Sequence, residues 1–159
     1  MKVFQENQKF TQLWLWIILL GINGLFAYGL YQQLVLEKNF GTNSMSNLGM
    51  IIAASLMVLL TVFFYNLELR TYIDRLQIHI HFFPLFKRTY KWEDIESAEV
   101  VKRLVLGYGI RFSPEGTVFN VKGNRLLKLT FRDGKTLLIG TQKPEALITF
   151  LKGMRPKNH

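Results

Sequence analysis

The sequence predicts an α+β fold in which two membrane-spanning helices precede an antiparallel β sandwich and a C-terminal helix. Three observations lead to this prediction. Two long stretches, residues 10–36 and 39–67, contain no Asp, Glu, Lys or Arg. From Glu68 onward, apolar and polar residues alternate with period two, which is typical of half-buried strands. Finally, residues 143–154 carry apolar side chains at helical spacing.

The two uncharged stretches predict spanning helices at about residues 13–34 and 48–67, because about 20 apolar residues cross the hydrocarbon core of a bilayer. Residues 37–47 between them are polar and few, so we expect a helical hairpin with residues 1–67 as the membrane anchor. Neither stretch carries an ionisable Asp, Glu, Lys or Arg that would indicate an ion or proton path. Aromatic side chains, which favour the membrane interface, lie near the ends of the two runs: Trp14, Trp16, Tyr31 and Tyr65.

Positive charge predicts the orientation of this hairpin. The linker holds one lysine, Lys38, whereas five Lys and Arg residues lie between positions 70 and 91. The positive-inside rule therefore places both termini in the cytoplasm and the linker outside. A cleaved signal peptide with a small-residue site at residues 27–29 is the alternative interpretation. Because the apolar run continues to Leu36, which is long for such a peptide, we favour the hairpin.

The segment 68–159 is predicted to hold seven strands and one helix. Asp133-Gly134 is typical of a two-residue type I′ hairpin turn, which would pair Phe131 with Thr136 and Leu129 with Leu138. The helix, at about residues 143–154, is expected to cover one end of the sandwich. Two of the strands flank this turn, and the other five are expected at about residues 76–82, 87–92, 97–105, 108–113 and 117–121.

The order of these elements resembles the pleckstrin-homology (PH) superfold. Two segments carry the resemblance: YKWEDIESAEV at residues 90–100, where a strand ends at Trp92 before an acidic turn, and LTFRDGKTLLIGTQKPEAL at residues 129–147, where the last hairpin runs into the helix. Together with the predicted anchor, the order resembles that of bacterial membrane proteins that carry a PH-like domain behind a transmembrane hairpin. The resemblance implies a seven-stranded antiparallel PH-like sandwich or barrel capped by the C-terminal helix. It also implies a place in the bacterial inner (cytoplasmic) membrane.

The sequence offers little for catalysis, and we expect no catalytic, cofactor or metal site. It has no cysteine and no G-x-S-x-G, H-E-x-x-H or Walker pattern. His79 and His81 have a spacing that suits zinc, but they lack an evident third ligand, so we interpret them as exposed strand residues. Gly107 and Gly109 form a partial G-x-G with no helix after it, which favours a bend in a strand over a nucleotide loop.

The remaining hypotheses concern binding. We expect a non-enzymatic, membrane-anchored binding or assembly module whose candidate partner surface includes Trp92, Tyr108, Phe150 and Leu151. The alternative is an anionic-lipid sensor that uses Lys87, Arg88 and Lys91, since the segment from Glu68 has 17 Lys and Arg against 9 Asp and Glu. A further alternative is an accessory subunit of a membrane enzyme or transporter. Nucleic acid is not an expected partner, because the basic residues are not interleaved with aromatic ones.

Overall fold

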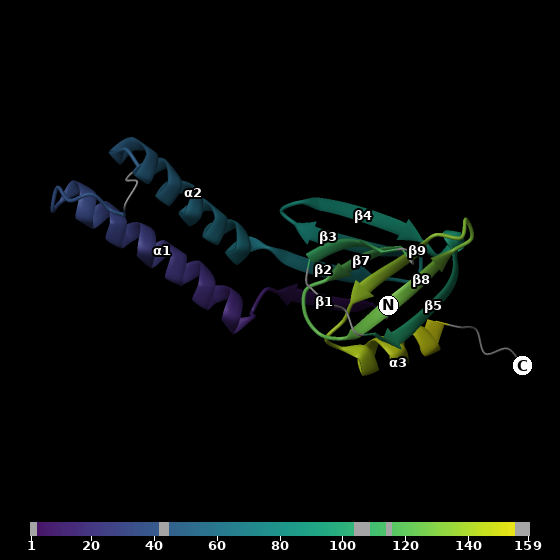
Figure 1. Ribbon diagram of the computed structural model, residues 1–159. Coiled ribbons are helices and arrows are strands. Elements are labelled where there is room, and N and C mark those ends of the chain that lie inside the picture. Colours follow the sequence, from purple (N-terminus) through teal and green to yellow (C-terminus); the bar gives the residue numbers. More distant parts are fainter. Residues whose placement is uncertain (1–2, 42–44, 104–108, 114–115, 155–159) are drawn as a thin grey trace, which may run out of the picture. The chain divides into compact units, whose positions relative to one another are not determined.

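The computed structural model describes residues 3–41, 45–103, 109–113 and 116–154. These residues form nine strands, three α-helices and one short 3₁₀ turn (Figure 1). The elements follow one another as β1 (Phe4–Lys9), α1 (Leu13–Leu34), α2 (Asn47–Asn66), β2 (Glu68–Ile73), β3 (Gln77–Phe83), β4 (Phe86–Lys91), η1 (Trp92–Asp94), β5 (Ile95–Lys102), β6 (Gly109–Ser113), β7 (Gly116–Asn120), β8 (Arg125–Phe131), β9 (Thr136–Gly140) and α3 (Pro144–Met154).

The chain divides into two compact units. Thr11–Asn66, which contains α1 and α2, forms one unit. The other unit, called here the β domain, joins the N-terminal residues through Phe10 to the chain from Leu67 onward. The helical unit is therefore an insertion in the sequence of the β domain, between β1 and β2.

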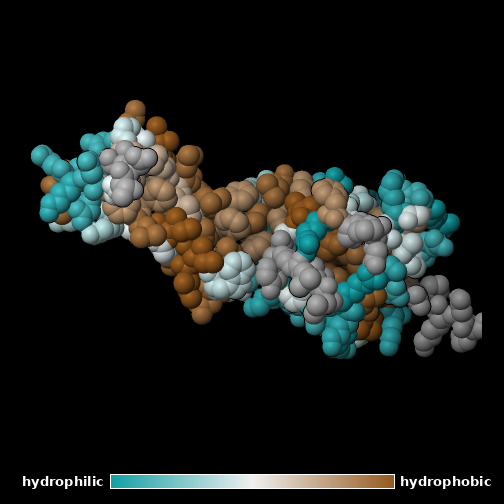
Figure 2. All heavy atoms as spheres, in the orientation of Figure 1, coloured by the Kyte–Doolittle hydropathy of each residue, from teal (hydrophilic) through white to brown (hydrophobic). Residues whose placement is uncertain are grey.

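The two helices α1 and α2 lie where the uncharged stretches predicted them, and both are long and apolar enough to cross a membrane. Only 11% of the apolar stretch of α1 and 6% of that of α2 is buried, which is unlike the core helix of a soluble protein. Figure 2 accordingly shows a largely hydrophobic surface along the helices. The two helices pair through the amide of Asn23, whose Nδ2 donates to Thr61 Oγ1 at 2.8 Å, and through the rings of Trp16 and Tyr65.

The β domain contains two sheets. The first, sheet A, has the antiparallel order β1-β2-β3-β4, and the second, sheet B, has the order β5-β8-β9-β7-β6. Within sheet B, β7 and β9 run parallel, because the β6–β7 hairpin is inserted in the chain between β5 and β8. The seven predicted strands are present as β3 to β9. The prediction of a seven-stranded, antiparallel sandwich or barrel is wrong in two respects: the described residues form sheets of four and five strands, and β7 and β9 are parallel.

The sequence analysis missed β1 and β2 for a physical reason. In β1, every second side chain is buried, but only one of the three buried residues, Phe4, is apolar; the other two are Glu6 and Gln8. The buried face of β1 therefore cannot be recognised from its hydrophobicity. In β2, too, the buried side chains are of both kinds, since Glu68 and Thr71 are buried together with Leu69 and Ile73. The assignment of residues 1–67 to the anchor is corrected accordingly: Phe4–Lys9 is a strand paired along its length with β2.

Apolar side chains from both sheets fill the β domain. The aromatic pairs Phe86–Phe119 and Tyr90–Phe131, with ring centroids 5.3 and 5.2 Å apart, join β4 to sheet B. The helix α3 adds Leu147, which is 1% exposed. The fully buried apolar residues that surround these contacts include Leu69, Ile73, Ile78, Ile80, Phe82, Leu126, Leu127, Leu129 and Ile139.

The turn between β8 and β9 corrects the predicted register by one residue. Phe131 N–H donates to Lys135 O at 2.9 Å, and Gly134, at φ +81°, closes a three-residue loop instead of a two-residue turn. Leu129 therefore pairs with Leu137, and Leu138 moves to the other face of the sheet. There it packs in a cluster with Val118 and Leu126.

Candidate functional site

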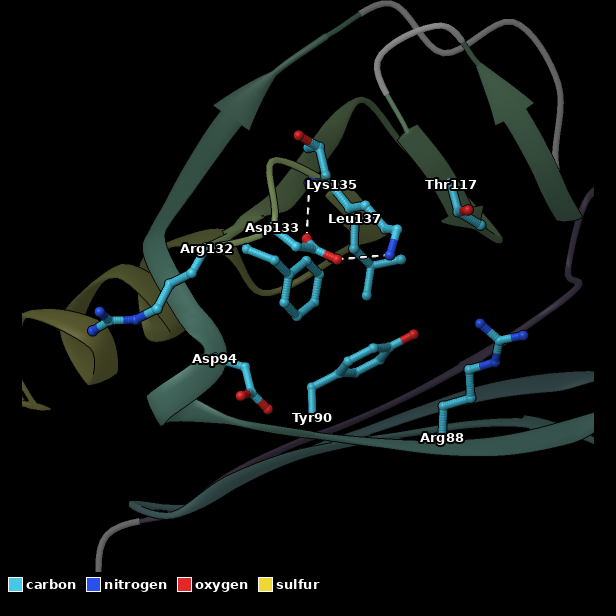
Figure 3. Close-up of a pocket in the computed structure, with 10 residues that line it drawn as sticks. Arg88, Tyr90, Asp94, Thr117, Arg132, Asp133, Lys135 and Leu137 are labelled. Atoms are coloured by element: carbon cyan, nitrogen blue, oxygen red, sulfur yellow. Dashed lines mark hydrogen bonds and ion pairs between the residues drawn. The ribbon is translucent and has the colours of Figure 1, made fainter.

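A pocket of about 530 Å³ lies between β4 and the β8–β9 turn (Figure 3). Its size is within the range of small-molecule sites, about 300–1,000 Å³. Strand β4 contributes two residues, η1 and β7 one each, and the β8–β9 hairpin the remainder. The lining residues are Arg88, Tyr90, Asp94, Thr117, Phe131, Arg132, Asp133, Lys135, Thr136 and Leu137.

Four of these side chains carry hydrogen-bond donors that point into the same space. Figure 3 shows the ends of Arg88, Tyr90, Thr117 and Lys135 converging there from two strands, β4 and β7, and the β8–β9 turn, whereas Arg132 points away. The ring of Tyr90 is held in place by its contact with Phe131. Guanidinium, ammonium and hydroxyl donors are the groups that bind phosphate and carboxylate oxygens. This end of the pocket therefore suits an anionic group.

Two carboxylates balance this charge. The Asp133 carboxylate accepts hydrogen bonds from Lys135 Nζ at 2.6 Å and from the backbone N–H of Lys135 at 3.0 Å. The hydrogen bond from the Lys135 ammonium lowers the pKa of Asp133, and the same bond raises the pKa of Lys135, so both groups stay charged at neutral pH. Asp94 lies at the other side of the Tyr90 ring (Figure 3). A molecule with both an anionic group and hydroxyl or amino donors fits this distribution.

The three basic residues named as lipid contacts do not form one cluster. Arg88 lines the pocket, whereas Lys87 and Lys91 alternate with it along β4 and so lie on the opposite face of the strand. The two lysines are four positions apart, which corresponds to about 13 Å along a strand. Lys91 forms an ion pair with Glu93 at 3.1 Å, and the hydrogen bond that its ammonium donates to that carboxylate raises the pKa of Lys91.

A second hollow, called here the α3 groove, brings together two of the residues named as partner surface. Trp92 and Leu151 line it, and its volume is about 290 Å³. The indole Nε1 of Trp92 also donates to Asp74 O at 2.8 Å, which holds the β2–β3 turn against η1. The other lining residues are Arg75, Ile95, Glu96, Ser97, Ala98 and Met154.

The other two residues of that predicted surface are placed differently. The ring of Phe150 contacts Phe4 of β1, with centroids 6.2 Å apart, and is not part of the α3 groove. Tyr108 lies outside the described residues, as does most of the partial G-x-G segment.

The two strand histidines make local contacts. His79 Nδ1 lies 3.0 Å from Thr89 Oγ1, and its Nε2 lies 3.8 Å from Asp74 Oδ2. The ring of His81 packs edge-on against Phe83. Within the part of the chain that the structure describes, no group of three His, Asp or Glu side chains is arranged to hold a metal ion.

The sequence analysis missed a set of polar contacts made by β1. The buried carboxylate of Glu6 accepts the hydroxyl of Thr141 at 2.6 Å and the N–H of Gln142 at 2.5 Å, immediately before α3. Gln8 Nε2 donates to Gly140 O at 2.6 Å. Strand β1 therefore bonds to both sheet A and the end of sheet B. The signal available in the sequence was the period-two spacing of Phe4, Glu6 and Gln8, which contains only one apolar residue.

No family model and no curated protein matches this chain. Among the described residues, three features are suited to a function: the pocket beside Arg88, the α3 groove and the paired strands β1 and β2, which flank the helical insertion in sequence. The first suits a small anion and the second suits an apolar anchor from a partner. The third determines how the β domain is attached.

Proposed function

We propose that the protein is a non-enzymatic binding and assembly module that presents a PH-like domain at the cytoplasmic face of the bacterial inner membrane. The observation that carries this proposal is the position of the helical insertion. The chain leaves the β domain after Lys9 and returns at Glu68, and these two residues are direct partners in sheet A. The helical insertion therefore connects two neighbouring, paired strands of one sheet.

This attachment supports a hairpin topology. Because β1 and β2 pair with each other, both must lie on the same side of a membrane, which requires an even number of crossings between them. Two candidate spans satisfy that requirement. Cleavage near residues 27–29 would instead separate β1 from its sheet and remove Glu6 from Thr141 and Gln142. The excess of Lys and Arg after α2 favours the cytoplasmic side for the β domain.

The arrangement of strands supports the PH-like assignment. The four strands of sheet A and the meander β5-β8-β9 amount to seven strands, and α3 follows them in the chain. The β6–β7 hairpin is then an addition at the β9 edge of sheet B. A fold of this kind hosts many activities, so the binding function rests on the groove and the pocket and not on the fold.

The mechanism we propose is presentation of the α3 groove to a protein partner. Two connections hold the β domain, three residues before α1 and one residue after α2, so it has less freedom than a domain on a single flexible linker. The groove combines apolar side chains, including Leu151 and Met154, with the charged Arg75 and Glu96 at its rim. Interfaces are commonly built from an apolar anchor and a polar rim of this kind.

The test is affinity capture of the tagged full-length chain from native membranes in mild detergent. We expect a near-stoichiometric protein partner for the native chain, and its loss in Leu151→Asp. The matched control is Lys152→Glu, which changes an exposed neighbour on the same helix outside the groove. Circular dichroism checks that both variants fold. Absence of any partner in the native chain, or equal loss in both variants, would count against the proposal.

A second candidate function, recognition of an anionic ligand, is supported by the four converging donors of the pocket. Replacing Arg88 by Gln removes a charge-assisted hydrogen bond of about 1.5–3 kcal/mol, which corresponds to a loss in affinity of about 10-fold or more. Calorimetric titration with glycerol 3-phosphate provides the measurement. Lys87→Gln is the control, because Lys87 lies on the other face of the same strand. Undetectable binding to the native chain, or equal weakening by both changes, refutes the pocket as the site.

The accessory-subunit alternative predicts that the captured partner is itself a membrane enzyme or transporter. In that case the activity of the complex, measured with and without this chain, decides whether the module regulates its partner or only assembles with it. An unchanged activity restricts the role to assembly.

A further inference from the structure

The β3–β4 turn exposes three apolar residues in a row. Phe83 is 38% and Leu85 50% exposed, and Pro84 between them is exposed as well. A contiguous exposed apolar tip of this kind commonly marks an interaction site. The Phe83 ring contacts His81 and the Arg70 guanidinium, and the remaining part of its surface and half of Leu85 stay exposed.

The location of this turn in sheet A is informative. Phe83 is the partner of Glu68 in the β2–β3 pair, and Glu68 is the partner of Lys9 in the β1–β2 pair. The three residues form one row across the sheet. The β3–β4 turn therefore lies at the end of sheet A where β1 ends and β2 begins, which is the end from which the helical insertion leaves. The β2–β3 turn, with Leu76, lies at the opposite end.

The connections to the helices limit how far this row can lie from a bilayer. Leu67 alone separates α2 from β2. A chain covers at most about 3.6 Å per residue, so Glu68 lies within about 7 Å of the end of α2 at any angle between sheet and helix. Phe83 is on the next strand, about 5 Å further. The polar layer on each side of the hydrocarbon core is about 5–8 Å thick. If α2 spans a bilayer, Glu68 therefore lies within about the thickness of the headgroup layer, and Phe83 lies no more than about 12 Å from the end of α2.

Basic side chains surround the apolar tip. The Arg70 guanidinium lies 5.8 Å from the centroid of the Phe83 ring, and Lys87 is exposed just beyond the turn. Lys9, 60% exposed at its side chain, lies in the same row of the sheet. The acidic residue of that row, Glu68, is buried and bonded to Asn7, Lys9 and Arg70. Exposed apolar residues flanked by Lys and Arg are the combination that binds anionic membrane surfaces.

From these observations we infer that the β3–β4 turn inserts Phe83 and Leu85 into the interfacial layer of the bilayer that the helical insertion spans. Arg70 and Lys87 contact the phosphates of anionic lipids beside it. This inference rests on the proposed membrane anchoring and adds a second, reversible attachment of the β domain. It assigns lipid contact to residues other than Arg88 and Lys91, which lie further along β4 from the turn.

The chain has no cysteine, so one introduced cysteine is a unique labelling site. We would label Leu85→Cys with the fluorophore NBD in the full-length chain, reconstituted in nanodiscs of phosphatidylcholine and phosphatidylglycerol. Quenching by doxyl-labelled lipids then reports contact with the acyl region. The matched control is Leu76→Cys, which is 72% exposed in the turn at the opposite end of sheet A. Leu20→Cys, within α1 and 62% exposed, reports whether the helices span the disc.

The expected result is strong quenching and a blue-shifted emission for the labels at positions 85 and 20, and at least threefold weaker quenching at position 76. Weak quenching at positions 85 and 76 together with strong quenching at position 20 overturns the inference and leaves membrane anchoring intact. Weak quenching at position 20 overturns membrane anchoring itself. Lys87→Gln should lower the quenching at position 85 in discs with phosphatidylglycerol, whereas Lys91→Gln should not. Equal quenching in discs of phosphatidylcholine alone refutes the contact with anionic lipids.

Discussion

Replacement of Glu6 by alanine should destabilise the β domain strongly, although the helical insertion separates Glu6 in sequence from the rest of that domain. Glu6 is 3% exposed, and its carboxylate accepts two hydrogen bonds, from Thr141 Oγ1 and Gln142 N. A hydrogen bond to a charged group contributes about 1.5–3 kcal/mol, and removal of the carboxylate leaves two donors without their acceptor. We therefore expect the free energy of unfolding to fall by about 3 kcal/mol or more. For a domain of about 100 residues this corresponds to a decrease in Tm of about 12 °C or more.

The assay is thermal unfolding of the full-length chain in detergent, followed by the strand signal in circular dichroism. Gln5→Ala is the matched control, because Gln5 is the neighbouring residue on the exposed side of β1. It should change the free energy of unfolding by less than about 0.5 kcal/mol. If Glu6→Ala and Gln5→Ala have equal effects, β1 does not contribute to the β domain, and the argument for a hairpin topology from the β1–β2 pair is refuted.

Three further predictions follow from other contacts. Gly116→Ala should lower the free energy of unfolding by about 2 kcal/mol or more, because φ is +127° there and an added Cβ would collide with the backbone of Thr136. Its control is Gly153→Ala, where an added Cβ meets open space. In the same melting experiment this variant should be neutral or stabilising. The backbone N–H groups of Leu76 and Gln77 donate to the Asp74 carboxylate and lower the pKa of Asp74. The charged carboxylate therefore stabilises the fold at a pH above the usual Asp pKa, and this contribution is lost as the pH falls through the lower pKa of the folded state. The stability difference between the native chain and Asp74→Asn should therefore shrink on acidification from about pH 5 to pH 3, and a constant difference would contradict this origin. Asn23→Leu should weaken the pairing of α1 with α2 by about 0.6–1 kcal/mol, and a double-mutant cycle with Thr61→Val should show coupling between the two sites.

The sequence predicted the elements whose pattern is made by apolar residues alone. The helices α1 and α2 were found because charges are missing from them, and α3 was found from the spacing of residues such as Leu147 and Leu151. Strand β3 was found because Ile78, Ile80 and Phe82 alternate with polar residues. In each case burial of apolar area decides the local structure, and composition records it directly.

The other features depend on polar contacts between distant parts of the chain, which one sequence does not show. The burial of Glu6 and Gln8 becomes favourable only when Gly140, Thr141 and Gln142 supply their partners. The β8–β9 register differed from the predicted one because Asp133-Gly134 is compatible with both a two-residue and a three-residue loop. Apolar side chains lie on both faces of these strands, so the hydrophobic pattern did not distinguish the two registers. The pocket was missed because its donors come from β4, β7 and the β8–β9 turn, three segments that only the tertiary fold brings together.

The place of the helical insertion has a consequence for the biogenesis of this protein. Strand β1 is synthesised before the helical insertion but has no partner until β2 has been made, and its contact with Thr141 spans 135 residues of sequence. Both helices must be made, and by the proposed topology inserted, before the strand can join its sheet. A hairpin inserted in the wrong orientation, or only halfway, would leave the β domain without its first strand and with an open core. Folding of this domain would thereby act as a check on the insertion of its own anchor, and failed molecules would be exposed to proteolysis.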